Sequence, residues 1–251
     1  MPIDNVVFVF GAGSNMDYGF FDNEGLMRYC AYTFPEKLKN NKQLADQLEP
    51  AQTYVNKLAT ILMPYNHHES MDHVLSLHKD LQRAGKLAIA DAILFCERQV
   101  KSMLPLVLYR ILFKFLTMDH KGSPIKRPED LHLIKDNTAT FITFNYDRSL
   151  EHYFNTAFES FASNFYYEVP TYYIHGSIGP YNKSTFGLDI DSDGYNLADA
   201  AKGINILYEN RDLQNFSGIY KALQSAKALF FLGFHFDEDN LNLFSSVRLK
   251  N

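Results

Sequence analysis

Three stretches rich in β-branched and aromatic residues divide the chain, and each ends in glycine or in polar residues. They are residues 5–10, 139–144 and 228–232. Runs of this kind are typical of strands in a parallel sheet, where helices cover both faces. We therefore predict a strand at each of the three, and two shorter aromatic strands at 165–169 and 171–174.

Between the first two strands the hydrophobic period changes to that of a helix. From residue 24 to residue 119, Leu, Ala, Lys, Gln and Met dominate and few glycines interrupt. We predict that Ser70 caps one helix of this block and that Pro64 and Gly85 separate helices. Residues 102–118 are expected to form a buried helix, because apolar residues lie nearly all round it.

The order of these elements predicts the fold class. A helix is expected at 149–158, and a further helix is expected to begin near residue 239, after the last strand. Alternating strands and helices favour a doubly wound, Rossmann-like α/β fold with a parallel sheet. The chain, 1–251, is then a single domain in which residues 24–119 form an inserted helical subdomain.

Composition and charge exclude several classes of protein. The 251 residues are 46% apolar, which is enough for a full globular core and excludes a disordered chain. The net charge of −5 provides no overall basic field, so we expect no direct binding to nucleic acid. No stretch is long and apolar enough for a membrane span, and the N-terminus shows no signal-peptide pattern. We therefore expect a cytoplasmic protein that does not bind a membrane.

The chain has two cysteines, Cys30 and Cys96. Two are too few for a disulfide framework or for a four-cysteine zinc site. We expect both to be buried thiols, and we expect no zinc.

Small residues follow the first strand directly, as Gly11-Ala12-Gly13-Ser14. Small side chains let the backbone approach a phosphate or a ribose, and a following helix would point its N–H groups at the anion. Met16 stands where the dehydrogenase fingerprint has its third glycine. A tight turn with a purely structural purpose is the alternative.

Asn145 and Asp147 follow the second strand, at the edge where open α/β sheets bind ligands. An amide and a carboxylate two residues apart can hold a diol. The alternative is that Asp147 caps the helix that begins near Ser149.

His175-Gly176-Ser177 follows the strand predicted at 171–174, and Gly233 follows the last strand. Histidine is suited to proton transfer near neutral pH, and the glycine after it is expected to leave the imidazole accessible from a cleft. A structural histidine is the alternative.

In chain order, four segments resemble the signature blocks of the SIR2-like family, the sirtuin-fold branch that includes bacterial NAD-consuming antiphage effectors. These segments are Gly11–Ser14, Asn145–Asp147, His175–Ser177 and 233–240. The resemblance implies that Asn145 positions the nicotinamide ribose and the attacking nucleophile, and that His175 acts as a base. It further implies NAD contacts at Gly11, Ala12, Gly13, Ser14, Asp147, Gly176, Ser177 and Gly233.

Two departures from the protein-deacylating sirtuins bear on the activity. The Pro-Asp-Phe-Arg segment that follows their glycine loop is absent, and so are the cysteines of their zinc module. The resemblance therefore implies an NAD glycohydrolase that releases nicotinamide and ADP-ribose, with NAD as its substrate and no further cofactor. A deacylase, an ADP-ribosyltransferase and a non-catalytic nucleotide-binding assembly subunit are the alternatives.

An NAD-depleting effector in antiphage defence must be inactive by default. We therefore expect control through a homo-oligomer or a regulatory protein partner, with the block at 24–119 as the candidate contact surface. The alternative is that this block packs on its own α/β domain.

Overall fold

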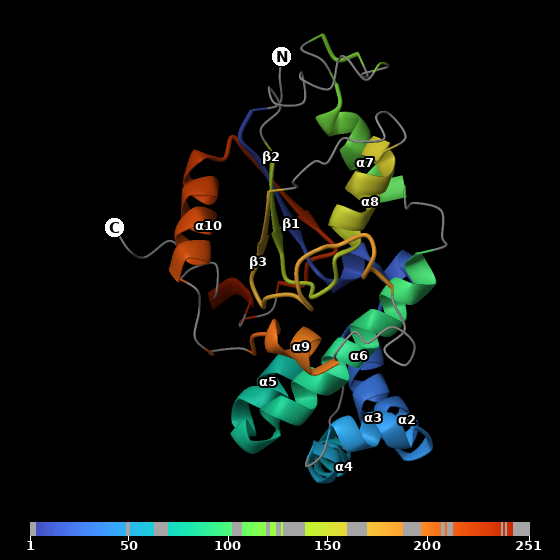
Figure 1. Ribbon diagram of the computed structural model, residues 1–251. Helices are drawn as coiled ribbons and strands as arrows, with labels where there is room; N and C mark the ends of the chain where they lie inside the picture. Colours follow the sequence, from blue (N-terminus) through green and yellow to red (C-terminus); the bar gives the residue numbers. More distant parts are fainter. Residues whose placement is uncertain are drawn as a thin grey trace.

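A four-stranded parallel sheet lies at the centre of the computed structural model, in the order β3-β2-β1-β4 (Figure 1). Phe10 pairs with Thr143 and Leu232, and Thr143 pairs with Tyr173, so all four strands end at one edge. The strands are β1 (Val6–Phe10), β2 (Ala139–Thr143), β3 (Thr171–Tyr173) and β4 (Ala228–Leu232). The structure describes residues 4–48, 51–62, 70–101, 107–118, 121–123, 127, 139–159, 170–187, 197–206, 209, 213–236, 238 and 240–242.

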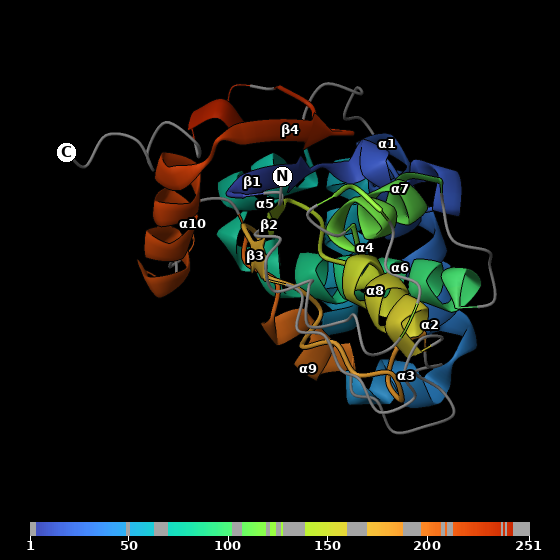
Figure 2. The ribbon, with the colours of Figure 1, turned by 90° about the horizontal axis from the view of Figure 1, so that it is seen from above.

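Helices cover both faces of the sheet, as the α/β prediction requires. α7 (Val107–Leu116) and α8 (Ser149–Glu159) lie on one face, and α10 (Leu213–Ser225) lies on the other (Figure 2). Phe115 of α7 meets Phe8 of β1 edge to face, with ring centroids 6.0 Å apart. The α/β class and the parallel sheet are therefore confirmed.

β1 and its neighbour β4 differ in burial. All five residues of β1 are buried, and Phe8 stacks on Phe141 of β2 and on Phe230 of β4. In β4, however, Leu229, Phe230 and Phe231 are 42%, 45% and 38% exposed. The sequence of β4 is as apolar as that of β1, but β4 is an edge strand that helices cover only in part.

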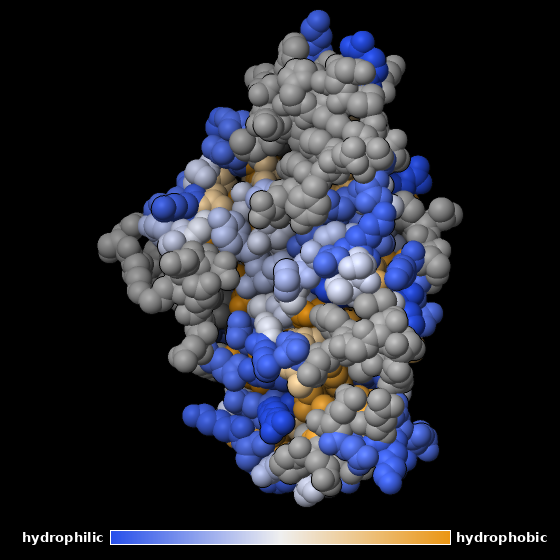
Figure 3. Space-filling model, viewed as in Figure 1, coloured by the Kyte–Doolittle hydropathy of each residue, from blue (hydrophilic) through white to orange (hydrophobic). Residues whose placement is uncertain are grey.

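The α-helices described between β1 and β2 coincide with the predicted helical block except at Asn23, the first residue of α1, and most of the block lies beyond one end of the sheet (Figure 1). A π-helical turn, Tyr29–Thr33, joins the first two helices. The short helix α9 (Leu197–Lys202) packs against this block at α6. The helices before α7 are α1 (Asn23–Arg28), α2 (Phe34–Asn40), α3 (Lys42–Gln47), α4 (Ala51–Leu62), α5 (Met71–Leu77) and α6 (Gln82–Val100). On the face shown in Figure 3, hydrophobic side chains gather in the lower half, around α6 and α9.

Local predictions for the block have mixed outcomes. Ser70 caps α5 as predicted, because its hydroxyl accepts a hydrogen bond from the His73 N–H at 3.0 Å. The predicted break at Gly85 is wrong, since Gly85 lies inside α6. A Cβ at Gly85 would lie 2.4 Å from the methyl groups of Leu75, so glycine here allows α5 to pack closely on α6. Pro64 lies outside the described residues, as does the strand predicted at 165–169.

The apolar helix predicted at 102–118 is buried on one face only. Its described part, α7, buries Tyr109, Leu112, Phe113 and Leu116 against the α/β core. Val107 and Ile111 are 67% and 58% exposed, so burial all round the helix is wrong. Within the described ranges, no helix has the length and apolar character needed to cross a membrane. Cys30 and Cys96 are both buried free thiols, as predicted.

Candidate functional site

The turns after β1 and β4 lie against each other at the carboxyl edge of the sheet. The Gly13 N–H donates to the Gly233 carbonyl at 3.0 Å. A Cβ at Gly11 would lie 2.6 Å from the Gly233 carbonyl oxygen. Gly233 has a φ of +58°, and its Cβ would lie 2.0 Å from the Ser14 nitrogen. Contact between two backbones is therefore a sufficient reason for Gly11 and Gly233.

No α-helix begins at the glycine turn, contrary to the prediction. Two single 3₁₀ turns follow instead, Ala12–Ser14 and Met16–Tyr18, and the first α-helix begins at Asn23. The Ser14 N–H donates to the Gly11 carbonyl, and the Asn15 N–H donates to the Ala12 carbonyl. These N–H groups are thus used inside the turn, where an anion-binding helix terminus would leave them free.

Asn145 connects the end of β2 to the glycine turn. Its backbone N–H donates to Thr143 Oγ1 at 3.0 Å, and its Nδ2 donates to the Gly11 carbonyl and to Ser14 Oγ, both at 3.2 Å. Nδ2 is the donor side of the amide, so Oδ1 is left as the acceptor side. Two of the predicted site segments are therefore joined by direct hydrogen bonds.

Asp147 is buried and holds two groups of its own chain. Asn15 Nδ2 donates to both carboxylate oxygens, at 3.0 and 2.9 Å, and the Ser149 N–H donates to Oδ1 at 3.0 Å. Burial raises the pKa of Asp147, and the hydrogen bonds from Ser149 and Asn15 oppose that rise. Ser149 is the first residue of α8, so Asp147 accepts a hydrogen bond from the start of this helix, as the alternative role in helix capping expects.

Sequence reasoning missed the partners of Asp147. Tyr109 of α7 donates from its hydroxyl to Asn15 Oδ1 at 2.5 Å, so a buried network runs from Tyr109 through Asn15 to Asp147. Asn15 stands next to the glycine turn, which was a usable signal. Tyr109 lies within an apolar helix segment, and nothing in its sequence context sets it apart.

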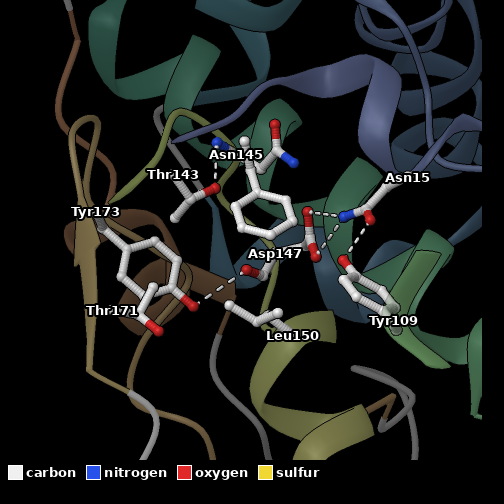
Figure 4. A pocket seen from close by; sticks show the side chains of 9 residues that line it. Asn15, Tyr109, Thr143, Asn145, Asp147, Leu150, Thr171 and Tyr173 are labelled. Atoms are coloured by element: carbon white, nitrogen blue, oxygen red, sulfur yellow. Dashed lines mark hydrogen bonds between the residues drawn. The ribbon is translucent and has the colours of Figure 1, made fainter. Parts of the chain in front are cut away.

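A small pocket opens between these groups (Figure 4). Tyr173 stands on one side of it, and the group of Asn15, Asp147 and Tyr109 stands on the other. Its volume of about 10 Å³ is close to that needed for one water molecule. The lining residues are Phe10, Asn15, Tyr109, Thr143, Asn145, Asp147, Leu150, Thr171 and Tyr173.

His175 does not line this pocket. It is 8% exposed, and its imidazole lies against the rings of Phe144 and Tyr146, at centroid distances of 5.5 and 6.0 Å. The expectation that the imidazole is accessible from a cleft is therefore wrong. Gly176 has a φ of +69° and its Cβ would lie 2.0 Å from the Gly203 carbonyl oxygen, so backbone contact explains this glycine. The Ser177 N–H donates to the same carbonyl at 3.0 Å.

Neither the known family models nor the curated proteins match this chain.

A buried ion pair fixes the segment that carries Asn145 and Asp147. Arg148 and Glu97 of α6 have side chains 1% and 0% exposed, and Arg148 Nη2 donates to Glu97 Oε2 at 2.6 Å. The Arg148 N–H and Nε both donate to Glu97 Oε1. Arg148 Nη1 reaches the Pro180 carbonyl at 3.3 Å. One side chain thus joins the end of β2, the helical block and the loop after β3.

The described residues contain no group of three or more His, Cys, Asp or Glu side chains that could hold a metal ion.

Proposed function

We propose that this chain is an NAD glycohydrolase that resembles the SIR2-like effectors. The observation that carries the proposal is the pair of hydrogen bonds from Asn145 Nδ2 to the Gly11 carbonyl and to Ser14 Oγ. These bonds bring two of the four SIR2-like segments into contact. The other two segments begin at His175 and Gly233, which follow β3 and β4 at the same edge.

The departure of the leaving group needs little help from the protein. Nicotinamide departs as a neutral molecule, so the protein must stabilise an oxocarbenium-like ribose and position a water molecule. In this proposal Asn145 Oδ1 accepts a hydrogen bond from a ribose hydroxyl or from the water. His175 takes a proton from a ribose hydroxyl as the oxocarbenium-like ribose forms, and it returns the proton to the same oxygen once the water has added.

The size of the pocket limits where NAD can lie. A dinucleotide cannot enter a volume of about 10 Å³, but one water molecule can. We therefore place the ribose across the edge of the sheet, over the glycine turn, with the pocket beneath it supplying the water. Because His175 is buried, its contact with the ribose requires a shift of Phe144 or Tyr146 when NAD binds.

The test is to incubate the purified chain with NAD, without any acylated peptide, and to measure the nicotinamide released by chromatography. Asn145→Ala and His175→Ala should each lower the rate by about 10²-fold, as loss of a positioning group or of a base does. Asn56→Ala, an exposed position on α4, is the matched control and should keep the full rate. A full rate in Asn145→Ala would remove the residue that carries the proposal.

A non-catalytic nucleotide-binding subunit is the second candidate. The observations that favour it are the buried imidazole of His175 and the internal use of the N–H groups of the glycine turn. Calorimetric binding of NAD without nicotinamide release would establish this function in place of the first. Release that depends on an acylated peptide would instead identify a deacylase.

A further inference from the structure

A second buried carboxyl group lies behind the pocket. Tyr173, whose side chain lines the pocket, donates from its hydroxyl to Glu151 Oε1 of α8 at 2.6 Å. The same hydroxyl lies 3.3 Å from the Asp147 carbonyl oxygen (Figure 4). A tyrosine hydroxyl has one proton, and the shorter contact assigns that proton to Glu151. The Tyr173 oxygen can then accept a hydrogen bond from a water molecule in the pocket.

Within the described part of the chain, the other oxygen of Glu151 lacks the hydrogen bonds that a structural carboxylate normally has. Glu151 Oε2 is buried and has no hydrogen-bond partner among the described residues. A buried polar atom without a partner costs free energy, and purely structural carboxylates are normally satisfied on both oxygens. The arrangement is better suited to a carboxyl group that gains and loses a proton.

Burial and the nearby charges also favour a Glu151 carboxyl group that can be protonated at neutral pH. Burial raises the pKa of Glu151 to about 7, the nearby carboxylates of Asp147 and Glu97 add to the rise, and the hydrogen bond from Tyr173 opposes it. Among the described residues, Arg148 is a fully buried cation near Glu151, and its guanidinium is bound to Glu97. Glu151 therefore changes its protonation state in the neutral range, where a general base is most useful.

We propose that Tyr173 and Glu151 form a proton relay that activates a water molecule in the pocket. The Tyr173 oxygen accepts a proton from the water while the Tyr173 hydroxyl passes its own proton to Glu151 Oε1. In the hydrolysis of NAD, on which this inference rests, the water oxygen bonds to C1′ of the ribose. The bond from C1′ to the nicotinamide nitrogen breaks, and its electron pair leaves with the nicotinamide. Glu151 then releases the proton to solvent.

The two residues have different parts in this step. Tyr173 is the catalytic residue, because its oxygen touches the water. Glu151 acts through Tyr173 and is a positioning residue that stores the proton. It must be ionised to accept that proton, so the rate should rise with pH through about 7.

The first experiment is the pH profile of nicotinamide release for the wild-type chain, Glu151→Gln and Tyr173→Phe. Glutamine keeps an oxygen that accepts the Tyr173 hydrogen bond but takes up no proton. We expect both variants to lose about 10²-fold in rate, and Glu151→Gln to lose the rise near pH 7. Glu159→Gln, at the last residue of the same helix, is the matched control and should keep both. A Glu151→Gln variant with the wild-type rate and profile would overturn the relay and leave the glycohydrolase proposal standing.

The second experiment needs no activity. Infrared difference spectra between pH 5 and pH 9 should contain the stretching band of a protonated carboxyl that titrates near pH 7. The band should be absent in Glu151→Gln and should titrate at higher pH in Tyr173→Phe, because the hydrogen bond that favours the ionised form is gone. A wild-type chain that releases no nicotinamide overturns the proposed function, and this titration still decides on Glu151. A spectrum unchanged in Glu151→Gln overturns the relay.

Discussion

Substitution of Gly233 by alanine tests how much the contact between the turns after β1 and β4 contributes to stability. The Cβ of Gly233→Ala would lie 2.0 Å from the Ser14 nitrogen and 2.2 Å from the Gly13 carbonyl carbon. Both atoms are backbone, so no side-chain rotation can relieve the contact. One of the two turns must move, and the hydrogen bond between Gly13 and Gly233 is then strained.

The cost has two parts. A left-handed φ costs alanine about 1–2 kcal/mol. Forcing an extra methyl group into a packed site costs a further ~1–3 kcal/mol. Together they predict a loss of roughly 3 kcal/mol or more in the free energy of unfolding. In a domain of this size that lowers the melting temperature by about 10 °C.

Gly19 provides the matched control. It also has a left-handed φ, of +83°, but nothing lies within 4 Å of the Cβ it would carry. Gly19→Ala should therefore pay only the conformational cost of about 1–2 kcal/mol. Urea denaturation of the two variants measures the difference. If Gly233→Ala were no less stable than Gly19→Ala, the contact between the turns would not explain Gly233.

Two further predictions concern the ion pair and the assembly. Arg148→Met should lower the free energy of unfolding by about 3–5 kcal/mol near neutral pH, because it leaves the Glu97 carboxylate buried and unpaired. Burial already raises the pKa of Glu97, so this loss in the free energy of unfolding should shrink as the pH falls and Glu97 is protonated. Urea denaturation at pH 5 and pH 8 measures the loss, and an equal loss at both pH values would contradict the reasoning. If assembly controls the activity, light scattering should detect an oligomer whose formation tracks nicotinamide release, and Ile111→Lys on the exposed side of α7 should weaken it. A chain that stays monomeric and hydrolyses NAD at full rate would refute assembly control.

The strands could be predicted because their signal is local. β-branched and aromatic residues follow one another in β1, β2 and β4, and such runs have few other stable structures. The exposure of Phe230 could not be predicted, since it depends on β4 lying at the edge of the sheet. Gly85 was misread for a similar reason, because a glycine that admits a neighbouring helix looks in sequence like a glycine that ends one.

The candidate site was predictable only in part. The carboxyl ends of four parallel strands meet at one edge, so four short segments were expected together, and Asn145 does contact the glycine turn. The Tyr109–Asn15–Asp147 network joins residues 94 and 132 positions apart, and no periodicity encodes such pairs. The side chains of Phe144 and Tyr146 cover His175. In the sequence, Phe144 ends a predicted strand and Tyr146 lies between Asn145 and Asp147, so neither indicates a contact with a histidine about 30 positions away.

The position of β1 between β2 and β4 has a consequence for how the chain folds. Residue 6 pairs with residue 139 on one side and with residue 228 on the other. During synthesis β1 leaves the ribosome before both of its partners, and β4 follows only after the helical block, β2 and β3 have been made. The helices before β2 can form in the meantime, because their hydrogen bonds are local. Closure of the sheet around β1 is then a late and slow step, and any failure to complete β4 leaves an apolar strand with an open edge that favours aggregation.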